Sequence, residues 1–209
     1  MSIRHGLLAL LDQGPRYGYQ LRTEFEARTG ATWPLNVGQV YTTLGRLERD
    51  GLVESAGEDG EGHQFYAVTE EGRAELRRWF DTPVPRTSPP RDELAIKLAM
   101  AVTVPGVDVA AVVQGQRRHS MKALQDYTRL KGRALAADSG PGGGSSNDLA
   151  WLLVLEQLIF QTEAEIRWLD HCEARLGQHA ERLAAAEPAA PVDAPPARRA
   201  VKSRARGRL

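Results

Sequence analysis

The chain has 209 residues, and its 27 Lys and Arg side chains balance its 27 Asp and Glu side chains, so the formal net charge at pH 7 is zero. The single cysteine, Cys172, excludes an internal disulfide and a cysteine-based zinc or iron–sulfur site. The most apolar run, residues 149–160, is too short to span a bilayer and no segment resembles a signal peptide, so we expect a cytoplasmic protein.

Three short helices are predicted in the first fifty residues. Residues 2–11 have apolar side chains at helical spacing and are followed by Gly14 and Pro15, which stop a helix. Residues 19–29 form the second candidate, and Gly30 is its C-terminal signal. Short helices separated by glycine and proline favour a compact helix-turn-helix core.

The third predicted helix, residues 36–49, is the most informative segment. Asn36 is a preferred N-cap residue, and Gly51 supplies the left-handed conformation that ends a helix. One face is apolar and consists of Val40, Leu44 and Leu47. The side chains off that face are of the kinds that contact base edges and phosphates: Gln39, Tyr41, Thr42, Thr43, Arg46 and Arg49. An ordinary amphipathic surface helix would show the same polarity.

A β-hairpin is predicted directly after this helix. Apolar segments at residues 52–56 and 63–68 flank a turn rich in glycine and acidic residues at 57–62. Thr69 then caps a fourth helix over residues 70–80, with acidic residues in its first turn. A polar helix followed at once by a hairpin is typical of a winged helix-turn-helix domain.

The remainder of the chain is predicted to be helical. The proline-rich segment 81–90 cannot continue a helix and marks a linker. Helices are expected over 92–102 and 107–137, followed by a Gly/Ser-rich loop at 138–147. The last helix is strongly amphipathic, with apolar residues at steps of three and four: Leu149, Leu152, Leu155, Ile159, Ile166, Leu169 and Leu176. Pairing of two chains across a two-fold axis would bury the leftover stripe, and an intramolecular bundle is the alternative.

The expected organisation has four parts: a winged helix-turn-helix domain at 1–80, a linker at 81–91, a helical dimerisation and effector region at 92–186, and a tail at 187–209. The fold class is therefore mainly α with a small β-hairpin. Proline and six cations without apolar periodicity predict a disordered tail. The tail either attracts DNA phosphates or only aids solubility.

The sequence resembles the PadR family of winged-helix transcriptional regulators. The resemblance rests on the motifs IRHGLLALL from Ile3, YGYQL from Tyr17, GQVYTTLGRLE from Gly38, DGLV from Asp50 and FYAVTEEGR from Phe65. Two further motifs, RDELAIKL from residue 91 and WLD from residue 168, resemble the helical C-terminal half of the family. The resemblance implies a homodimer that binds double-stranded operator DNA, usually as a repressor, and releases it when a small-molecule effector binds.

On this reading, Gln39, Tyr41, Thr42 and Thr43 would face the major groove or its rim. Arg46 and Arg49 would hold phosphates, and Tyr17 and Tyr19 would brace the DNA backbone. His63 and Gln64 remain available at the descending edge of the wing. The wing itself departs from the family, whose members often carry basic residues there, because this chain has Glu58, Asp59 and Glu61.

Charge argues for weak contact between the wing and DNA. Residues 1–86 contain ten arginines, no lysine and thirteen acidic residues, which gives a net charge of −3. Since affinity for duplex DNA comes largely from cations placed against phosphates, the acidic wing is expected to stay off the backbone. The alternative function is a winged-helix adaptor that binds another protein and no specific DNA sequence.

No enzyme, metal or cofactor site is expected. The run Asp170, His171, Cys172 and Glu173 cannot converge on one atom, because neighbouring helical residues point in different directions. Trp151 and Trp168 could line an aromatic effector pocket at the dimer seam, although such residues more often fill a core.

Overall fold

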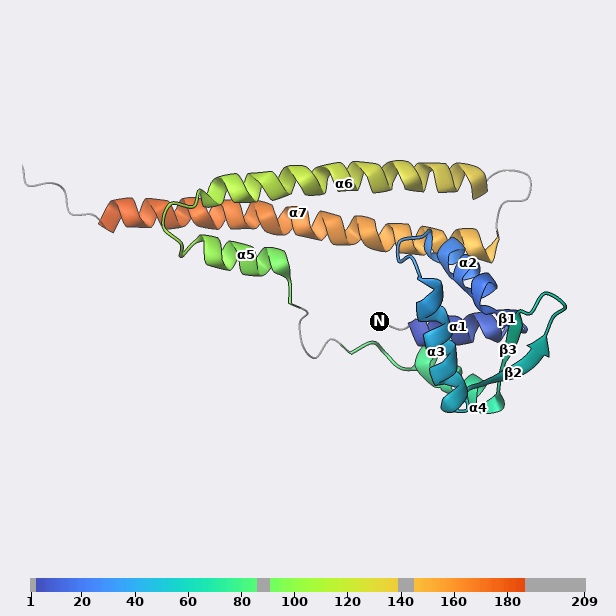
Figure 1. The fold of residues 1–209 in the computed structure, drawn as a ribbon. Helices are drawn as coiled ribbons and strands as arrows, with labels where there is room; N and C mark the ends of the chain where they lie inside the picture. The colour runs from blue at the N-terminus through green and yellow to red at the C-terminus, as the bar shows by residue number, and fades with distance from the viewer. Residues whose placement is uncertain (1–2, 86–90, 139–144, 187–209) are drawn as a thin grey trace, which may run out of the picture.

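The structure is a computed structural model, which describes residues 3–85, 91–138 and 145–186. Helices predominate, and a small sheet lies near the N-terminal end of the chain (Figure 1). The elements in chain order are α1 (Ile3–Leu11), β1 (Arg16–Tyr17), α2 (Gly18–Thr29), α3 (Val37–Arg49), β2 (Val53–Glu58), β3 (Gln64–Val68), α4 (Glu70–Asp81), α5 (Glu93–Ala101), α6 (Val109–Asp138) and α7 (Ser146–Ala186). The predicted winged helix-turn-helix fold with long C-terminal helices is confirmed. The expected tail, residues 187–209, lies outside the described residues.

The wing is part of a three-stranded antiparallel sheet with the order β1-β3-β2. Strands β2 and β3 form the predicted hairpin, with Val53 opposite Val68 and a register irregularity between Ser55 and Glu58. Strand β1, in which Tyr17 pairs with Phe65, is not predicted by the sequence pattern. A strand of two residues has no periodicity to detect, and it exists only because β3 offers it a free edge.

A single apolar core holds the N-terminal helices against the sheet. It is made of buried residues from α1 to α4 and from β2 and β3: Leu7, Leu8, Leu10, Leu11, Leu21, Leu35, Val40, Leu44, Leu47, Leu52, Val53, Val68 and Leu76. The predicted apolar face of α3, Val40, Leu44 and Leu47, is fully buried in this core. Its burial orients the opposite face of α3 toward solvent.

Local chemistry at both ends of α3 agrees with the prediction. Asn36 Oδ1 accepts a hydrogen bond from the Gly38 amide at 2.8 Å, and Gln39 Oε1 accepts one from the Asn36 amide at 3.3 Å, which completes the capping box. At the other end, Gly51 has a φ of +72°, a left-handed conformation that glycine adopts without strain. The chain therefore leaves α3 sharply and enters β2.

The C-terminal half is an antiparallel pair of long helices, α6 and α7, with the shorter α5 against one end (Figure 1). On α7, the residues that the sequence offered for a dimer seam are largely buried within the protomer, namely Leu152, Leu155, Ile166 and Leu169. A buried polar contact also joins the pair, since Ser120 Oγ lies 2.5 Å from Glu165 Oε1. The strongest apolar stripe of α7 is thus intramolecular.

A joint connects the two halves, where the beginning of α7 meets the end of α2. A side chain at Gly30 would lie 2.2 Å from the ring of Trp151, so the bare backbone at Gly30 is what admits this tryptophan. Beside it, Arg28 Nε donates to Asn147 Oδ1 at 2.9 Å. Arg28 also donates to Gln13 Oε1 at 2.6 Å, so one arginine ties α7 to two segments of the N-terminal half.

Two glycines give a matched test of this packing. A Cβ at Gly72 would lie 2.1 Å from the Leu52 carbonyl oxygen, whereas one at Gly45 would meet nothing within 4 Å. We expect Gly72→Ala to lower the free energy of unfolding by about 1–3 kcal/mol through overpacking. Gly45→Ala should raise it by about 0.5–1 kcal/mol, because alanine favours an exposed helix. Urea unfolding followed by circular dichroism measures both, and equal effects would contradict the packing around Gly72.

Candidate nucleic-acid interface

The outward face of α3 is the most DNA-like surface in the described residues. Successive helical residues are about 100° apart, so the side opposite the buried Val40 and Leu44 carries Thr42, Arg46 and Arg49. A shallow hollow lies here, between α3 and the beginning of α1. We call it the α3 hollow, and it is lined by Ile3, Asn36, Gly38, Gln39, Thr42, Thr43 and Arg46. Four predicted site residues therefore share one concave surface.

Arg46 is available to bind an anion. Its side chain is exposed on α3, and no described carboxylate forms an ion pair with it. Apart from Arg77, every other described arginine in residues 3–85 has a carboxylate within 4 Å. These paired residues are Arg4, Arg16, Arg22, Arg28, Arg49, Arg73 and Arg78. Most arginines in this half are therefore paired with a carboxylate of the same protomer, whereas Arg46 has no such partner among the described residues.

The ion pair of Arg49 is longer than those of the other paired arginines. Its Nε lies 3.9 Å from Asp50 Oδ1, and its side chain is 72% exposed. Asp50 also pairs with Arg4 at 2.7 Å, so the carboxylate retains a partner if Arg49 turns away. An exposed pair of this kind contributes little to stability. Arg49 can exchange Asp50 for a phosphate at small cost.

The uncharged side chains of the α3 hollow have restricted hydrogen-bonding options. The hydroxyls of Thr42 and Thr43 donate to the carbonyls of Gly38 and Gln39, each at 2.7 Å. In this arrangement each hydroxyl can only accept from a base, and its methyl group faces outward. The side-chain oxygen of Gln39 serves the capping box, which leaves its NH₂ group to donate.

Tyr41 occupies a flank of α3 rather than its outward face. Its ring packs over Gly18 at the beginning of α2, where a Cβ would lie 2.7 Å from the ring. It remains 40% exposed. Burial raises the pKa of neighbouring Tyr66, and Glu48 and Tyr41 add to the rise. Tyr41 and Thr43 lie on opposite flanks, so Tyr41 is not part of the α3 hollow.

Two glycines also lie on the outward face of α3, and they were not among the predicted site residues. Gly38 and Gly45 are seven residues apart and therefore lie on the same side of α3. Gly45 has no neighbour within 4 Å, so packing within the protomer does not explain it. A mid-helix glycine costs about 1 kcal/mol relative to alanine. A glycine inside a predicted polar helix face was the signal that could have marked a surface for close approach.

The other predicted contact residues belong to the wing or lie apart from α3. Tyr17 stacks on His63 with ring centroids 4.5 Å apart and meets Phe65 edge-on at 5.4 Å. The Gln64 amide donates to Ser55 Oγ at 2.6 Å and to the Gly57 carbonyl at 3.0 Å. The contacts of Tyr17, His63 and Gln64 are therefore made within the wing and its neighbouring strand β1. Tyr19, on α2, is 56% exposed and free of such contacts in the described structure.

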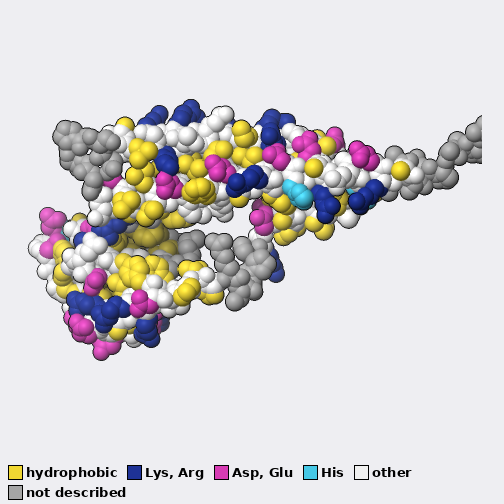
Figure 2. All heavy atoms as spheres, turned by 180° about the vertical axis from the view of Figure 1, so that it is seen from behind, with side chains coloured by type: hydrophobic (Ala, Val, Ile, Leu, Met, Phe, Trp, Pro, Cys, Tyr) yellow, Lys and Arg dark blue, Asp and Glu magenta, His cyan; other side chains and the backbone are white. Residues whose placement is uncertain are grey.

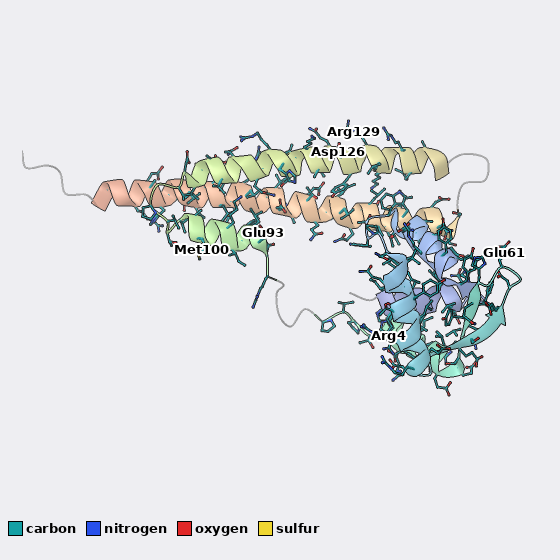
Figure 3. The ribbon with its side chains drawn as sticks, in the orientation of Figure 1. Arg4, Glu61, Glu93, Met100, Asp126 and Arg129 are labelled. Carbon is teal, nitrogen blue, oxygen red and sulfur yellow. The ribbon has the colours of Figure 1, made fainter. Side chains whose placement is uncertain are left out.

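The acidic tip of the wing is organised by Asp59. Its Oδ1 accepts the amides of Glu61 at 3.0 Å and His63 at 2.9 Å, and its Oδ2 lies 2.9 Å from His63 Nδ1. Figure 3 shows Glu61 at the outer end of the hairpin. Asp59, Glu61 and His63 hold potential metal-binding atoms within 4.8 Å of one another, but the turn already uses both Asp59 oxygens. We assign this cluster to turn formation.

The two candidate effector tryptophans do not share a cavity in the protomer. Trp151 is half-buried against Gly30 at the joint. Trp168 is 37% exposed and lines an apolar groove among α5, α6 and α7. Seventeen residues of one helix separate them, about 25 Å along its axis. In the same groove, burial raises the pKa of the Cys172 thiol, which keeps it protonated and weakly nucleophilic at neutral pH.

Comparison with known families gives two matches in tandem. Residues 7–78 match the model of the transcriptional regulator PadR-like family, and residues 90–177 match the virulence activator alpha C-terminal model. The first match runs from the middle of α1 to most of α4, and the second spans α5, α6 and most of α7. No described helix is long and apolar enough to cross a membrane.

Two curated relatives resemble most of the chain. The probable transcriptional regulator Rv1176c of Mycobacterium tuberculosis is 31% identical over 182 residues, covering 81% of this chain and 95% of that protein. The negative transcriptional regulator PadR of Bacillus subtilis is 25% identical over 176 residues, covering 80% and 93%. These coverages extend the resemblance through the C-terminal helices.

Solved structures share the fold. Bacillus subtilis PadR in complex with operator DNA has a TM-score of 0.61 at 23% identity, covering 83% of this chain and 97% of that chain. The same protein in complex with p-coumaric acid has a TM-score of 0.64 at 22% identity, covering 84% and 98%. The Vibrio cholerae virulence activator AphA has a TM-score of 0.63 at 25% identity, covering 85% and 99%.

The wing turn should be sensitive to acid. Hydrogen bonds from the His63 and Glu61 amides and the nearby His63 ring hold the pKa of Asp59 below its ordinary value. A depressed carboxyl pKa contributes stability above the unfolded-state value, and this is lost as pH falls through the folded-state value. We expect the two amide NMR signals to shift together with a midpoint below about 3.9. Asp59→Ala should remove that titration, and a midpoint at or above 3.9 in the parent protein would contradict the assigned bonds.

Proposed function

The chain belongs to the PadR-like family of transcriptional regulators, and from this premise we propose that it binds operator DNA as a homodimer. The proposal places α3 in the major groove and assigns repression as the outcome of binding. Support for repression comes from the relative in Bacillus subtilis, which is a negative regulator. We further propose that residues 1–80 form the DNA-binding domain, residues 81–91 the linker and residues 92–186 the dimerisation and effector region.

One observation carries the DNA-binding proposal: the α3 hollow contains an unpaired arginine. Arg46 stands beside Gln39 and Thr42, so a cation for phosphate and two polar groups for base edges share a surface. The buried Val40, Leu44 and Leu47 fix α3 rigidly beneath them. Phosphate contact and base readout are both within reach of this one face.

The charge balance shapes how this protein would bind. With most arginines of the N-terminal half engaged in ion pairs and an acidic wing tip, few cations remain to attract duplex DNA without regard to sequence. Specific contacts from α3 must supply a larger share of the affinity. We therefore propose weak non-specific binding and a shallow salt dependence, unless the basic residues beyond 187 add phosphate contacts.

The alternative function, a winged-helix adaptor for another protein, is favoured by the acidic wing alone. A titration of purified full-length protein against fluorescent genomic fragments separates the two functions. Saturable binding to a discrete subset of fragments at physiological salt supports the regulator. Uniform absence of binding at all salt concentrations supports the adaptor.

The homodimer proposal rests on an apolar face of α7 that the protomer leaves uncovered. Leu149, Leu153 and Phe160 are each at least 59% exposed, and they lie outside the buried stripe of α7. Helical spacing places them on one side, since steps of four and seven residues return to the same face. Figure 2 shows apolar side chains gathered along the helical arm where it faces the N-terminal half. A second copy would remove this surface from water.

Arg46 provides the sharpest test of the interface. We expect Arg46→Ala to weaken operator binding by about 1–3 kcal/mol, with no change in thermal stability, because its side chain makes no described ion pair. Arg77→Ala is the matched control, since Arg77 is likewise exposed and unpaired but lies on α4. Fluorescence anisotropy with the selected fragment gives both affinities. If Arg46→Ala binds like the parent, α3 is not in the groove.

Introducing charged residues on the exposed apolar face of α7 tests whether this face forms the dimer interface. A Leu153→Glu and Phe160→Glu double variant places two carboxylates on the uncovered face, so we expect sedimentation equilibrium to show a monomer. Phe80→Glu is the control, because Phe80 is 68% exposed on α4, away from the seam. A double variant that still sediments as a dimer would place the seam elsewhere.

A further inference from the structure

A groove at the far end of the helical arm has the chemistry of a binding site. It has a volume of about 770 Å³ and is bounded by α5, α6 and α7. Its floor is apolar and well buried, with Leu98 7% exposed and Val113 1% exposed. Ala95 and Ala99 of α5 stand on one wall, where small side chains leave the groove open. Apolar surface thus remains accessible between three packed helices.

The opposite wall comes from one face of α7. Trp168, Cys172, Arg175 and His179 recur at steps of three and four residues and all line the groove. Trp168 presents part of its ring, and Arg175 and His179 lie toward the C-terminal end, both exposed. The groove therefore has an apolar stretch at one end and two nitrogen-bearing side chains at the other.

The polar end of the groove has no acidic counterpart. The residues that line it include no Asp or Glu, and no described carboxylate pairs with Arg175 or His179. Asp170, five residues before Arg175 on α7, accepts from Arg117 Nε at 2.6 Å and does not line the groove. A guanidinium at the edge of an apolar groove is most favourably satisfied by a bound anion.

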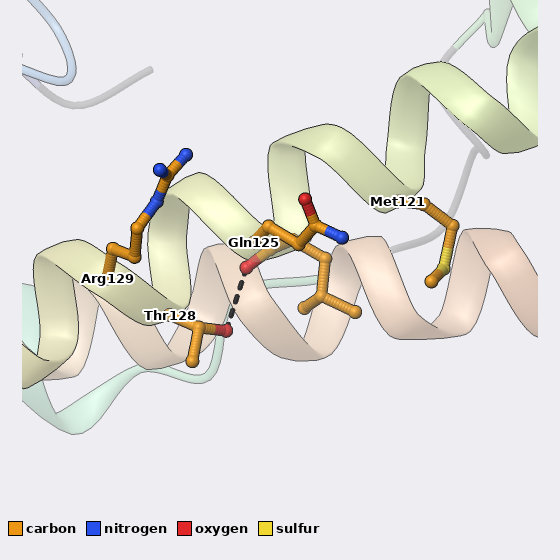
Figure 4. A pocket seen from close by; sticks show the side chains of 5 residues that line it. Met121, Gln125, Thr128 and Arg129 are labelled. Carbon is orange, nitrogen blue, oxygen red and sulfur yellow. Dashed lines mark hydrogen bonds between the residues drawn. The ribbon is translucent and has the colours of Figure 1, made fainter.

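A second hollow on the arm shows the contrast. Met121, Leu124, Gln125, Thr128 and Arg129 line it, and Thr128 Oγ1 donates to the Leu124 carbonyl at 2.7 Å (Figure 4). Arg129 at its edge already pairs with Asp126 one turn away. That hollow offers apolar surface without a free cation, so it lacks the feature that distinguishes the groove.

We propose that the groove among α5, α6 and α7 binds a small amphipathic anion, with its apolar body against Trp168 and Leu98 and its acidic group on Arg175 and His179. The acidic group can be a carboxylate, a sulfonate or a phosphate, since each accepts from a guanidinium. That such binding alters operator affinity rests on the function proposed above. A second protomer is a poorer occupant, because its apolar stripe would leave Arg175 and His179 unpaired in a drier environment.

Two dyes of matched shape test the proposal on the full-length protein. 8-Anilinonaphthalene-1-sulfonate carries a sulfonate, and N-phenyl-1-naphthylamine is its uncharged counterpart. We expect the sulfonate dye to bind more tightly than the neutral dye. Arg175→Gln should weaken the sulfonate dye about tenfold or more and leave the neutral dye unchanged, because only the charged contact is lost. Ala99→Leu should weaken both dyes by filling the groove.

Arg129→Gln is the matched control and should change neither dye, and thermal melting confirms that each variant folds. Equal affinities of the two dyes for the parent protein, or an Arg175→Gln variant that binds both like the parent, would overturn the proposal. So would absence of dye binding to a dimer whose seam covers the groove. Operator titrations without dye report separately on the DNA-binding function, so failure of one proposal is distinguishable from failure of the other.

Discussion

The burial of one face of α3 is the constraint on which the rest of the N-terminal half depends. Val40, Leu44 and Leu47 are completely enclosed by the core. Removing them from water fixes the rotation of α3 about its own axis, since turning the helix would expose leucine and bury arginine. The outward direction of Thr42 and Arg46 is therefore a consequence of core packing. The surface that we propose contacts DNA is therefore held in place by the core before any DNA binds.

Ion pairing decides which charges are left for a partner. The N-terminal half is acidic, and its arginines lie mostly beside carboxylates of the same half. On the outward face of α3, Arg46 has no carboxylate partner among the described residues, and this is why we propose it as the cation that contacts DNA. In the proposed binding mode, affinity depends on the fit of α3 to DNA more than on overall charge. Asp59, one of the acidic residues of the wing, stabilises the turn by accepting hydrogen bonds from two backbone amides.

Helix α7 serves two purposes through two faces. One face packs on α6 and, through Trp151 and Asn147, on the winged half. The other face exposes Leu153 and Phe160, and farther along Trp168 borders the groove. A single long helix therefore touches the DNA-binding half, carries the proposed dimer seam and lines the proposed anion site. If the groove and α3 act as proposed, the contacts of α7 with the end of α2 would connect the two sites.

The sequence by itself determined the local elements. Caps at Asn36 and Thr69, the stop at Gly51 and the apolar face of α3 are properties of neighbouring residues, and the structure shows each of them. The predicted hairpin is present, but its turn is residues 59–63 rather than 57–62. Tertiary structure alone decided the rest. Strand β1 exists because β3 lies beside it, and the Tyr41 ring packs over Gly18 because a glycine there leaves room for it. The most apolar stripe of α7 is buried within the protomer, and Trp151 packs against Gly30 in the winged half. Such outcomes depend on contacts between residues far apart in the chain, and spacing within a segment carries no record of them.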